Sequence, residues 1–266
     1  MKIGFIGLGN MGGSLARLVA RDERYRSELL LANRSRDKAE KIAAEVGGQP
    51  VSNAEVFAQA EVIFLGIKPA QFADLPAGYQ EVLEKRESLL LVSMAAGLPL
   101  ETLEKLTPRH HRWIRMMPNT PVAVGEGVIT YALSQQANQA DEDLLRELLS
   151  SAGLLVKLEE KQLDAATALA GCGPAFVYLF IEALADAGVR AGLSRDIALQ
   201  LANQTLLGAA KLGQVSGQHP AQLKDQVCSP AGSTIAGVAS LEENAFRGTV
   251  MAAVQASYKR TQELGK

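Results

Sequence analysis

Gly7-Leu8-Gly9-Asn10-Met11-Gly12 is the segment that most strongly constrains the architecture of this chain. It follows an apolar run at residues 2–6 and opens a segment in which Leu15, Leu18 and Val19 recur at helical spacing. A GxGxxG pattern between a strand and a helix is typical of dinucleotide binding, because its glycines permit a tight turn, close approach to the pyrophosphate, and close helix packing. The free N–H groups of the helix N-terminus also favour phosphate. We therefore predict that these six residues bind a dinucleotide, with a purely structural turn as the alternative.

Beyond this segment, short apolar runs alternate with amphipathic segments up to about residue 158, a spacing typical of βαβ units and a parallel sheet. The expected strands are residues 2–6, 29–32, 62–67, 89–93, 112–115, 128–131 and 154–157. After Glu159 the strand signal ends, and alanine- and leucine-rich segments of helical periodicity follow. The pattern predicts an α/β fold, with an N-terminal Rossmann-type doubly wound sheet (residues 1–159) and an all-α C-terminal oligomerisation domain (residues 160–266).

Composition favours a small-molecule partner. The 27 basic and 29 acidic side chains are interspersed along the 266 residues, so no basic tract indicates a nucleic-acid or membrane-surface binder. The two cysteines, Cys172 and Cys228, suit a reducing compartment, and the three histidines form no metal-ligand pattern. The N-terminus runs into a glycine turn instead of a cleavage site, so we expect a cytoplasmic protein without a metal.

The C-terminal half contains a charge-free stretch at residues 165–181, which approaches the length of a membrane span. Gly171, Gly173 and Pro174 interrupt it, so we expect two helices joined at this break and buried in protein. Helices that are apolar on most sides need cover on most sides. We therefore expect an obligate oligomer built through this domain, with a compact monomeric bundle as the alternative.

The end of the second expected strand decides between NAD and NADP. An acidic residue there would bind the ribose of NAD. This chain instead has Asn33-Arg34-Ser35-Arg36, in which two guanidinium groups and a hydroxyl can hold a 2′-phosphate. We predict NADPH, with NADH as the alternative and solvated surface charge as the other interpretation of the two arginines.

Two later strand ends also point to the cofactor, because ligands of open α/β sheets bind at the carboxyl ends of the strands. They are Gly66-Ile67-Lys68-Pro69 and Met94-Ala95-Ala96-Gly97, and the small residues of the second permit close backbone approach. Asn53 completes the predicted cofactor-binding set. For Lys68, a simple surface charge is an equal alternative.

Three further segments identify a family. Residues 115–121 read Arg-Met-Met-Pro-Asn-Thr-Pro, residues 169–175 read Leu-Ala-Gly-Cys-Gly-Pro-Ala, and residues 222–235 read Gln-Leu-Lys-Asp-Gln-Val-Cys-Ser-Pro-Ala-Gly-Ser-Thr-Ile. Together they resemble pyrroline-5-carboxylate reductase, and the similarity runs from the first strand to the final helix. The resemblance implies NAD(P)H-dependent reduction of 1-pyrroline-5-carboxylate to L-proline, the last step of proline biosynthesis. It also implies homodimers that intertwine through the helical domain, assembled into decamers in many members.

The resemblance further implies that substrate lies between the nicotinamide and the loop at residues 227–234. This loop precedes an apolar helical segment, so free backbone N–H groups are available for a carboxylate, although an ordinary helix N-cap is the alternative. We assign Thr234 as the catalytic hydroxyl beside the imine nitrogen. The predicted substrate-binding residues are Val227, Ser229, Gly232, Ser233 and Thr234.

The chain departs from the family pattern at three positions. The family often has Ser or Thr at the positions of Cys172 and Cys228, and commonly Gly at that of Ala231. These departures bear on how well the substrate fits the site more than on which class of reaction the protein catalyses.

Two other classes compete with this interpretation. A β-hydroxyacid dehydrogenase resembles the chain in its glycine stretch, but such enzymes use a lysine in a glycine-led helix, and residues 171–178 contain none. A non-catalytic NADP-binding sensor would have an eroded substrate loop, whereas this loop is intact.

Overall fold

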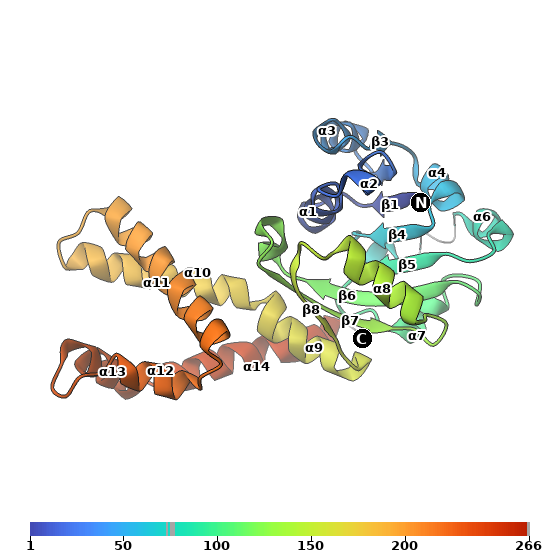
Figure 1. The fold of residues 1–266 in the computed structure, drawn as a ribbon. Helices are drawn as coiled ribbons and strands as arrows, with labels where there is room; N and C mark the ends of the chain where they lie inside the picture. Colours follow the sequence, from blue (N-terminus) through green and yellow to red (C-terminus); the bar gives the residue numbers. More distant parts are fainter. Residues whose placement is uncertain (73, 75–77, 265–266) are drawn as a thin grey trace. The chain divides into compact units, whose positions relative to one another are not determined.

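The computed structural model describes residues 1–72, 74 and 78–264, which form two compact units. Unit 1 comprises Met1–Cys172 with Ser257–Lys266, and unit 2 comprises Gly173–Ala256. Figure 1 follows the chain from the α/β part, drawn in blue to green, into the helical part, drawn in yellow to red. The predicted fold class is confirmed.

One sheet organises unit 1. Its strands occur in the order β3-β2-β1-β4-β5-β6-β7-β8. They are β1 (Ile3–Ile6), β2 (Leu29–Ala32), β3 (Gln49–Pro50), β4 (Val62–Leu65), β5 (Leu90–Ser93), β6 (Arg112–Pro118), β7 (Gly127–Leu133) and β8 (Gly153–Lys157). The two-residue β3 was not predicted, since it has no apolar run to mark it.

The prediction of an all-parallel pattern is wrong at one pair, because β7 runs antiparallel to β6. Residues 119–126, with the 3₁₀ turn Thr120–Val124, are all that joins these two strands. A parallel connection needs a crossover of about a dozen residues or more, so the short link forces the chain to reverse.

Helices cover both faces of the sheet, as the doubly wound prediction requires. On one face lie α1 (Asn10–Val19), α3 (Arg36–Val46) and α8 (Gln139–Leu148); on the other lie α4 (Asn53–Gln59), α6 (Gln80–Lys85), α7 (Leu100–Glu104) and α9 (Leu163–Ala166), while α2 (Glu23–Arg26) is a short surface turn. Strand residues alternate between the two cores: Phe5 belongs to the first and Ile6 to the second. Burial on both faces explains why β1, β2, β4 and β5 are almost continuously apolar.

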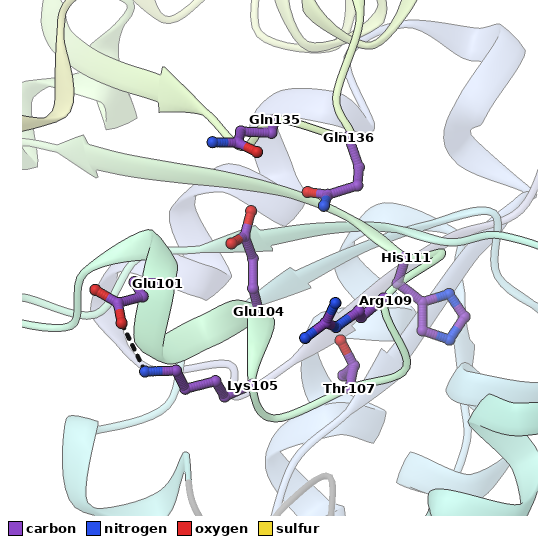
Figure 2. A pocket seen from close by; sticks show the side chains of 8 residues that line it. All are labelled: Glu101, Glu104, Lys105, Thr107, Arg109, His111, Gln135 and Gln136. Atoms are coloured by element: carbon purple, nitrogen blue, oxygen red, sulfur yellow. Dashed lines mark hydrogen bonds and ion pairs between the residues drawn. The ribbon is translucent and has the colours of Figure 1, made fainter.

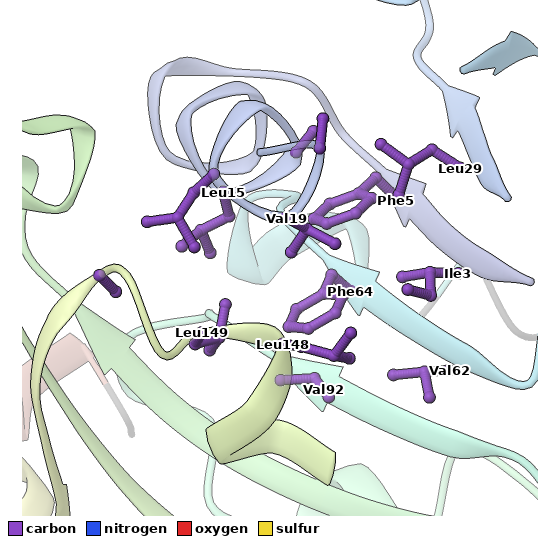
Figure 3. Packing of buried hydrophobic residues seen from close by; sticks show 14 of the residues in the cluster. Ile3, Phe5, Leu15, Val19, Leu29, Val62, Phe64, Val92, Leu148 and Leu149 are labelled. Atoms are coloured by element: carbon purple, nitrogen blue, oxygen red, sulfur yellow. The ribbon is translucent and has the colours of Figure 1, made fainter. Parts of the chain in front are cut away.

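The first core is centred on two stacked rings. Phe5 and Phe64, on neighbouring strands, lie 4.8 Å apart with ring planes inclined by 9°. Figure 3 shows Leu15 and Val19 of α1 and Leu148 of α8 around these rings. This packing fixes the strand ends that carry the predicted cofactor-binding turns.

Unit 2 has little core of its own. Its helices are α10 (Gly173–Arg190), α11 (Arg195–Ser216), α12 (Pro220–Gln226), α13 (Ser233–Glu243) and the first part of α14 (Phe246–Leu264). Its buried cluster consists of small residues, Ala185, Ala198 and Ala202, with Ile181 packed against them. Large apolar side chains such as Leu179, Leu207 and Met251 are each more than 60% exposed. A single copy of this unit leaves most of its apolar surface uncovered.

The predicted junction at residues 171–174 is present, since a π turn ends at Gly171 and α10 begins at Gly173, but it does not interrupt the helical path. Glu160–Arg190 is one continuous helical segment, which by length and composition could cross a membrane, and only 11% of its most apolar window is buried in one subunit. The segment contains a π turn, Thr167–Gly171, in which the Cys172 N–H donates to the Thr167 carbonyl over 3.0 Å. A π turn lets the helical path continue past Pro174, where an α-helix would lack one hydrogen bond.

Candidate active site

At two positions of the glycine turn after β1, only glycine fits. Gly7 has φ +91°, and its N–H donates to the Ala32 carbonyl over 2.9 Å. A Cβ on Gly12 would lie 2.1 Å from the Gly7 carbonyl oxygen. The close packing predicted from the GxGxxG pattern is therefore present in the structure.

The N-terminus of α1 offers the donors that a phosphate group needs. Gly9 is the N-cap, no side chain caps the helix, and the first intrahelical bond runs from the Gly13 N–H to the Gly9 carbonyl over 2.9 Å. The N–H groups of Asn10, Met11 and Gly12 therefore have no intrahelical acceptor. The space beside the Gly9 Cα is open, because a Cβ placed there would have no atom within 4 Å. This geometry fits a dinucleotide pyrophosphate.

Asn33 holds the glycine turn in place. Its Oδ1 accepts from the Leu8 N–H over 3.0 Å, and its Nδ2 donates to the Ser35 carbonyl over 3.1 Å. The amide thus joins the turn after β1 to the turn after β2. Its side chain is engaged with the backbone, a bracing role that no sequence pattern indicated.

The two predicted phosphate-binding arginines differ in their surroundings. Both are exposed, but Arg36 Nε donates to Glu40 Oε1 over 2.9 Å within α3, whereas Arg34 has no ion-pair partner among the described residues. Ser35 is the N-cap of α3, and its hydroxyl makes no capping bond. Arg34 is therefore the guanidinium more available for a 2′-phosphate.

Arg34 also lines a cavity of about 450 Å³ at the carboxyl edge of the sheet. The structure brings predicted residues Asn53 and Ile67 into the same cavity and adds Ile6, Gln71, Asp74, Gly78 and Tyr79, which the sequence did not single out. Tyr79 packs on Phe57 with ring centroids 5.0 Å apart. An apolar wall with a few polar groups suits a flat heterocycle.

The remaining residues predicted to contact the cofactor lie at the ends of β4 and β5. Gly66 packs directly against the glycine turn, since a Cβ on it would lie 2.5 Å from the Gly7 carbonyl oxygen. The Met94 N–H donates to the Leu65 carbonyl over 3.2 Å, Ala95 is buried, and Gly97 has φ +76°. Lys68, Pro69 and Ala96 follow on the same turns, with Lys68 and Pro69 exposed.

The predicted substrate loop belongs to unit 2 and links α12 to α13. The Gly232 N–H donates to the Ser229 carbonyl over 3.1 Å, and a Cβ on Gly232 would lie 2.3 Å from Ser229 Oγ. The first bond of α13 runs from the Ala236 N–H to the Gly232 carbonyl, and no side chain caps the helix. The N–H groups of Ser233 and Thr234 therefore have no intrahelical acceptor, and Val227 is exposed at the start of the loop.

Ala231 adopts a conformation that favours glycine, with φ +58°. The left-handed region costs an L-residue about 1–2 kcal/mol relative to glycine, which exceeds the entropy cost of the added freedom. We expect Ala231→Gly to stabilise the protein by about 0.5–1 kcal/mol in urea unfolding. The matched Ala221→Gly, inside α12, should destabilise it. Destabilisation by both substitutions would contradict a strained Ala231.

A second cavity, of about 480 Å³, lies at the other edge of the sheet (Figure 2). Its lining includes His111, just before β6, and Gln135, just after β7, so it opens at the amino ends of the parallel strands. His111 Nδ1 accepts from the Leu89 N–H, and Nε2 faces the Leu83 carbonyl, both over 3.1 Å. Both ring nitrogens of His111 therefore face backbone groups, and the cavity lies at the opposite end of the strands from the predicted cofactor site.

The burial of His111 should make the free energy of unfolding fall at acid pH. Burial, with a smaller contribution from the neighbouring His110, lowers the pKa of His111 from 6.5 to about 4. The unfolded chain then binds a proton that the folded one does not, so stability should fall by up to about 3 kcal/mol as pH drops from 6.5 to 4. In urea unfolding, the free energy of unfolding of His111→Gln should not show this decline between pH 6.5 and 4. The control variant His110→Gln should still show it. An unchanged decline in His111→Gln would contradict the assignment.

Comparisons with known proteins cover the whole chain. The family model "Pyrroline-5-carboxylate reductase dimerisation" matches residues 160–264, and "NADP oxidoreductase coenzyme F420-dependent" matches residues 2–97. Pyrroline-5-carboxylate reductase from Pisum sativum is 45% identical over 98% of this chain and 95% of its own length. The one from Synechocystis is 40% identical over 100% and 99%.

Solved structures agree with these relatives. The crystal structure of Plasmodium falciparum pyrroline carboxylate reductase with NADP bound has a TM-score of 0.89 and 35% identity, covering 100% of this chain and 98% of that one. The 1-pyrroline-5-carboxylate reductase of Streptococcus pyogenes gives 0.85 and 32%, covering 99% and 98%.

The fold and the glycine site define a nicotinamide-dinucleotide-dependent oxidoreductase. Identity of 45% over nearly the full length of both proteins narrows this class to one family. The chain belongs to the pyrroline-5-carboxylate reductase family, the imine-reducing oxidoreductases of proline biosynthesis. The family predicted from the three sequence motifs is confirmed.

Proposed function

We propose that this chain reduces 1-pyrroline-5-carboxylate to L-proline with NADPH, using Thr234 and the loop of residues 227–234 to hold the substrate. The observation that carries the proposal is the full-length relationship to reductases named for this substrate, together with an intact loop before α13. When bound, the cofactor supplies a hydride from C4 of its nicotinamide.

The cofactor assignment is supported by the residues around the glycine turn. The uncapped N-terminus of α1 and the open space beside Gly9 fit a pyrophosphate. The turn after β2 offers Arg34 and Ser35 and no carboxylate, which fits a 2′-phosphate. The NADP bound to the Plasmodium falciparum relative is consistent with this choice.

In this mechanism the loop of unit 2 orients the imino acid. The N–H groups of Ser233 and Thr234, at the start of α13, hold the substrate carboxylate together with Ser229. The Thr234 hydroxyl donates a hydrogen bond to the ring nitrogen, where negative charge develops as the imine carbon accepts the hydride, and the proton that the nitrogen then takes up comes from solvent. The imine carbon must reach the nicotinamide, so positioning carries most of the catalysis and no titrating carboxylate or histidine is needed.

In this proposal the chain divides into two domains. Residues 1–159 bind NADP, and residues 160–266 form the dimerisation and substrate domain. The exposed apolar side chains of α10, α11 and α14 are the surface that a second copy of this chain would cover. The match of residues 160–264 to a dimerisation family supports a homodimer, and a decamer is the further assembly we propose. A protein partner also accounts for the apolar Glu160–Arg190 segment without a membrane, in keeping with a cytoplasmic enzyme.

The cofactor assignment is tested by initial rates at fixed pyrroline-5-carboxylate with either dinucleotide varied. We expect kcat/KM for NADPH to exceed that for NADH by about tenfold or more, the value of one charge-assisted hydrogen bond. A preference for NADH would contradict the role given to Arg34 and Ser35.

A further inference from the structure

Pro174 leaves one helical carbonyl without its usual donor. In an α-helix the carbonyl of Ala170 would accept from the N–H of residue 174. Residue 174 is proline and has no N–H, yet the segment Glu160–Arg190 stays helical through this point. A carbonyl at such a place needs another donor.

The side chain of Asn119 supplies that donor. Asn119 follows β6, is 7% exposed, and its Nδ2 donates to the Ala170 carbonyl over 3.0 Å. Its Oδ1 accepts from the Val128 N–H over 2.8 Å, so the amide is oriented by the start of β7. One side chain therefore ties the π turn to two strands of unit 1.

A second side chain, from β6 itself, anchors the same helix. Arg115, four residues before Asn119 and 4% exposed, pairs with Glu160 over 3.3 Å and with Asp164 over 2.8 Å. Glu160 Oε1 also accepts from the Leu100 N–H over 2.6 Å, at the start of α7 and shortly after the Met94–Gly97 turn. The base of the helix is thus built onto the carboxyl edge of the sheet.

We propose that Asn119 is a positioning residue, which replaces the hydrogen bond that Pro174 cannot make and so fixes the base of the Glu160–Arg190 helix on the cofactor edge. For catalysis this rests on the proposed function, because the chain continues from this base into the unit that carries Thr234. Loss of the anchor should lower kcat and leave NADPH affinity unchanged, since the glycine turn does not depend on it.

The test is a double-mutant cycle with Pro174→Ala, which gives residue 174 an N–H of its own. Asn119→Ala should lower the thermal midpoint by several degrees and kcat by about tenfold. In the double variant the new N–H at position 174 can serve the Ala170 carbonyl, so most of both losses should be recovered. The matched control is Asn244→Ala, whose target carbonyl on Ser240 already accepts the Asn244 N–H over 3.2 Å, so little should change.

Hydrogen exchange of residues 163–172 separates this inference from the proposed function. Faster exchange in Asn119→Ala, reversed by Pro174→Ala, supports the anchor even if no imine is reduced; failure of the wild type to turn over pyrroline-5-carboxylate would overturn only the proposed function. Asn119→Asp, which keeps the acceptor for Val128 and loses the donor, should exchange as fast as Asn119→Ala if both fold. The inference would be overturned if the effects of Asn119→Ala and Pro174→Ala were additive in the double variant. Unchanged hydrogen exchange in both Asn119→Ala and Asn119→Asp would also overturn it.

Discussion

Replacing Thr234 by valine is expected to lower kcat/KM for pyrroline-5-carboxylate by about two to three orders of magnitude while NADPH affinity stays the same. Valine keeps the shape of threonine and removes only the hydroxyl, and loss of one donor to charge developing in the transition state costs about 3–4 kcal/mol. Thr234 is exposed near the N-terminus of α13 and carries no core packing, so folding should be unaffected. Steady-state rates and titration of NADPH fluorescence measure the two quantities.

Thr205→Val is the matched control for this substitution. Thr205 is exposed on α11, and its hydroxyl donates to the Leu201 carbonyl, so it tests the general effect of replacing a helical threonine. Its kinetics should match those of the unsubstituted protein. Equal rates for Thr234→Val and Thr205→Val would remove the Thr234 hydroxyl from the mechanism.

Replacing Arg34 by alanine is the second substitution for which we expect a large effect. A charge-assisted hydrogen bond to a phosphate is worth about 1.5–3 kcal/mol, so the Kd for NADPH should rise by roughly 10- to 100-fold. The Kd for NADH should not change, since NADH has no 2′-phosphate. Calorimetric titration with each dinucleotide gives both values.

Arg36→Ala provides the comparison, because Arg36 is paired with Glu40 and should contribute less. Arg24→Ala, at an exposed arginine paired with Asp22 and Glu147 away from the glycine turn, should leave both affinities unchanged. Equal weakening of NADPH and NADH by Arg34→Ala would mean that Arg34 does not read the 2′-phosphate.

The parts of the fold that sequence reasoning predicts best are those encoded locally. The glycine stretch after β1 could be identified because Gly7 and Gly12 are required by contacts within a few residues or on the adjacent strand. The strand runs were recognisable because burial on both faces makes them continuously apolar. The family followed from motifs, which need no knowledge of contacts.

The features that escaped prediction depend on contacts between distant segments. Gly171, Gly173 and Pro174 are helix breakers by local propensity, but the helical path continues through a π turn, where Asn119, far away in sequence, donates to the Ala170 carbonyl. The reversal of β7 follows from the length of a connection instead of from the strand's own residues. Likewise, the bracing of the glycine turn by Asn33 depends on two turns meeting in space.

Turnover of 1-pyrroline-5-carboxylate by the purified protein with NADPH is the decisive test of the proposed reaction. We expect cofactor absorbance to fall only when the imino acid is present, and one L-proline to form for each NADPH consumed. No oxidation of either NADPH or NADH, or oxidation without formation of proline, would show that the chain does not catalyse this reduction.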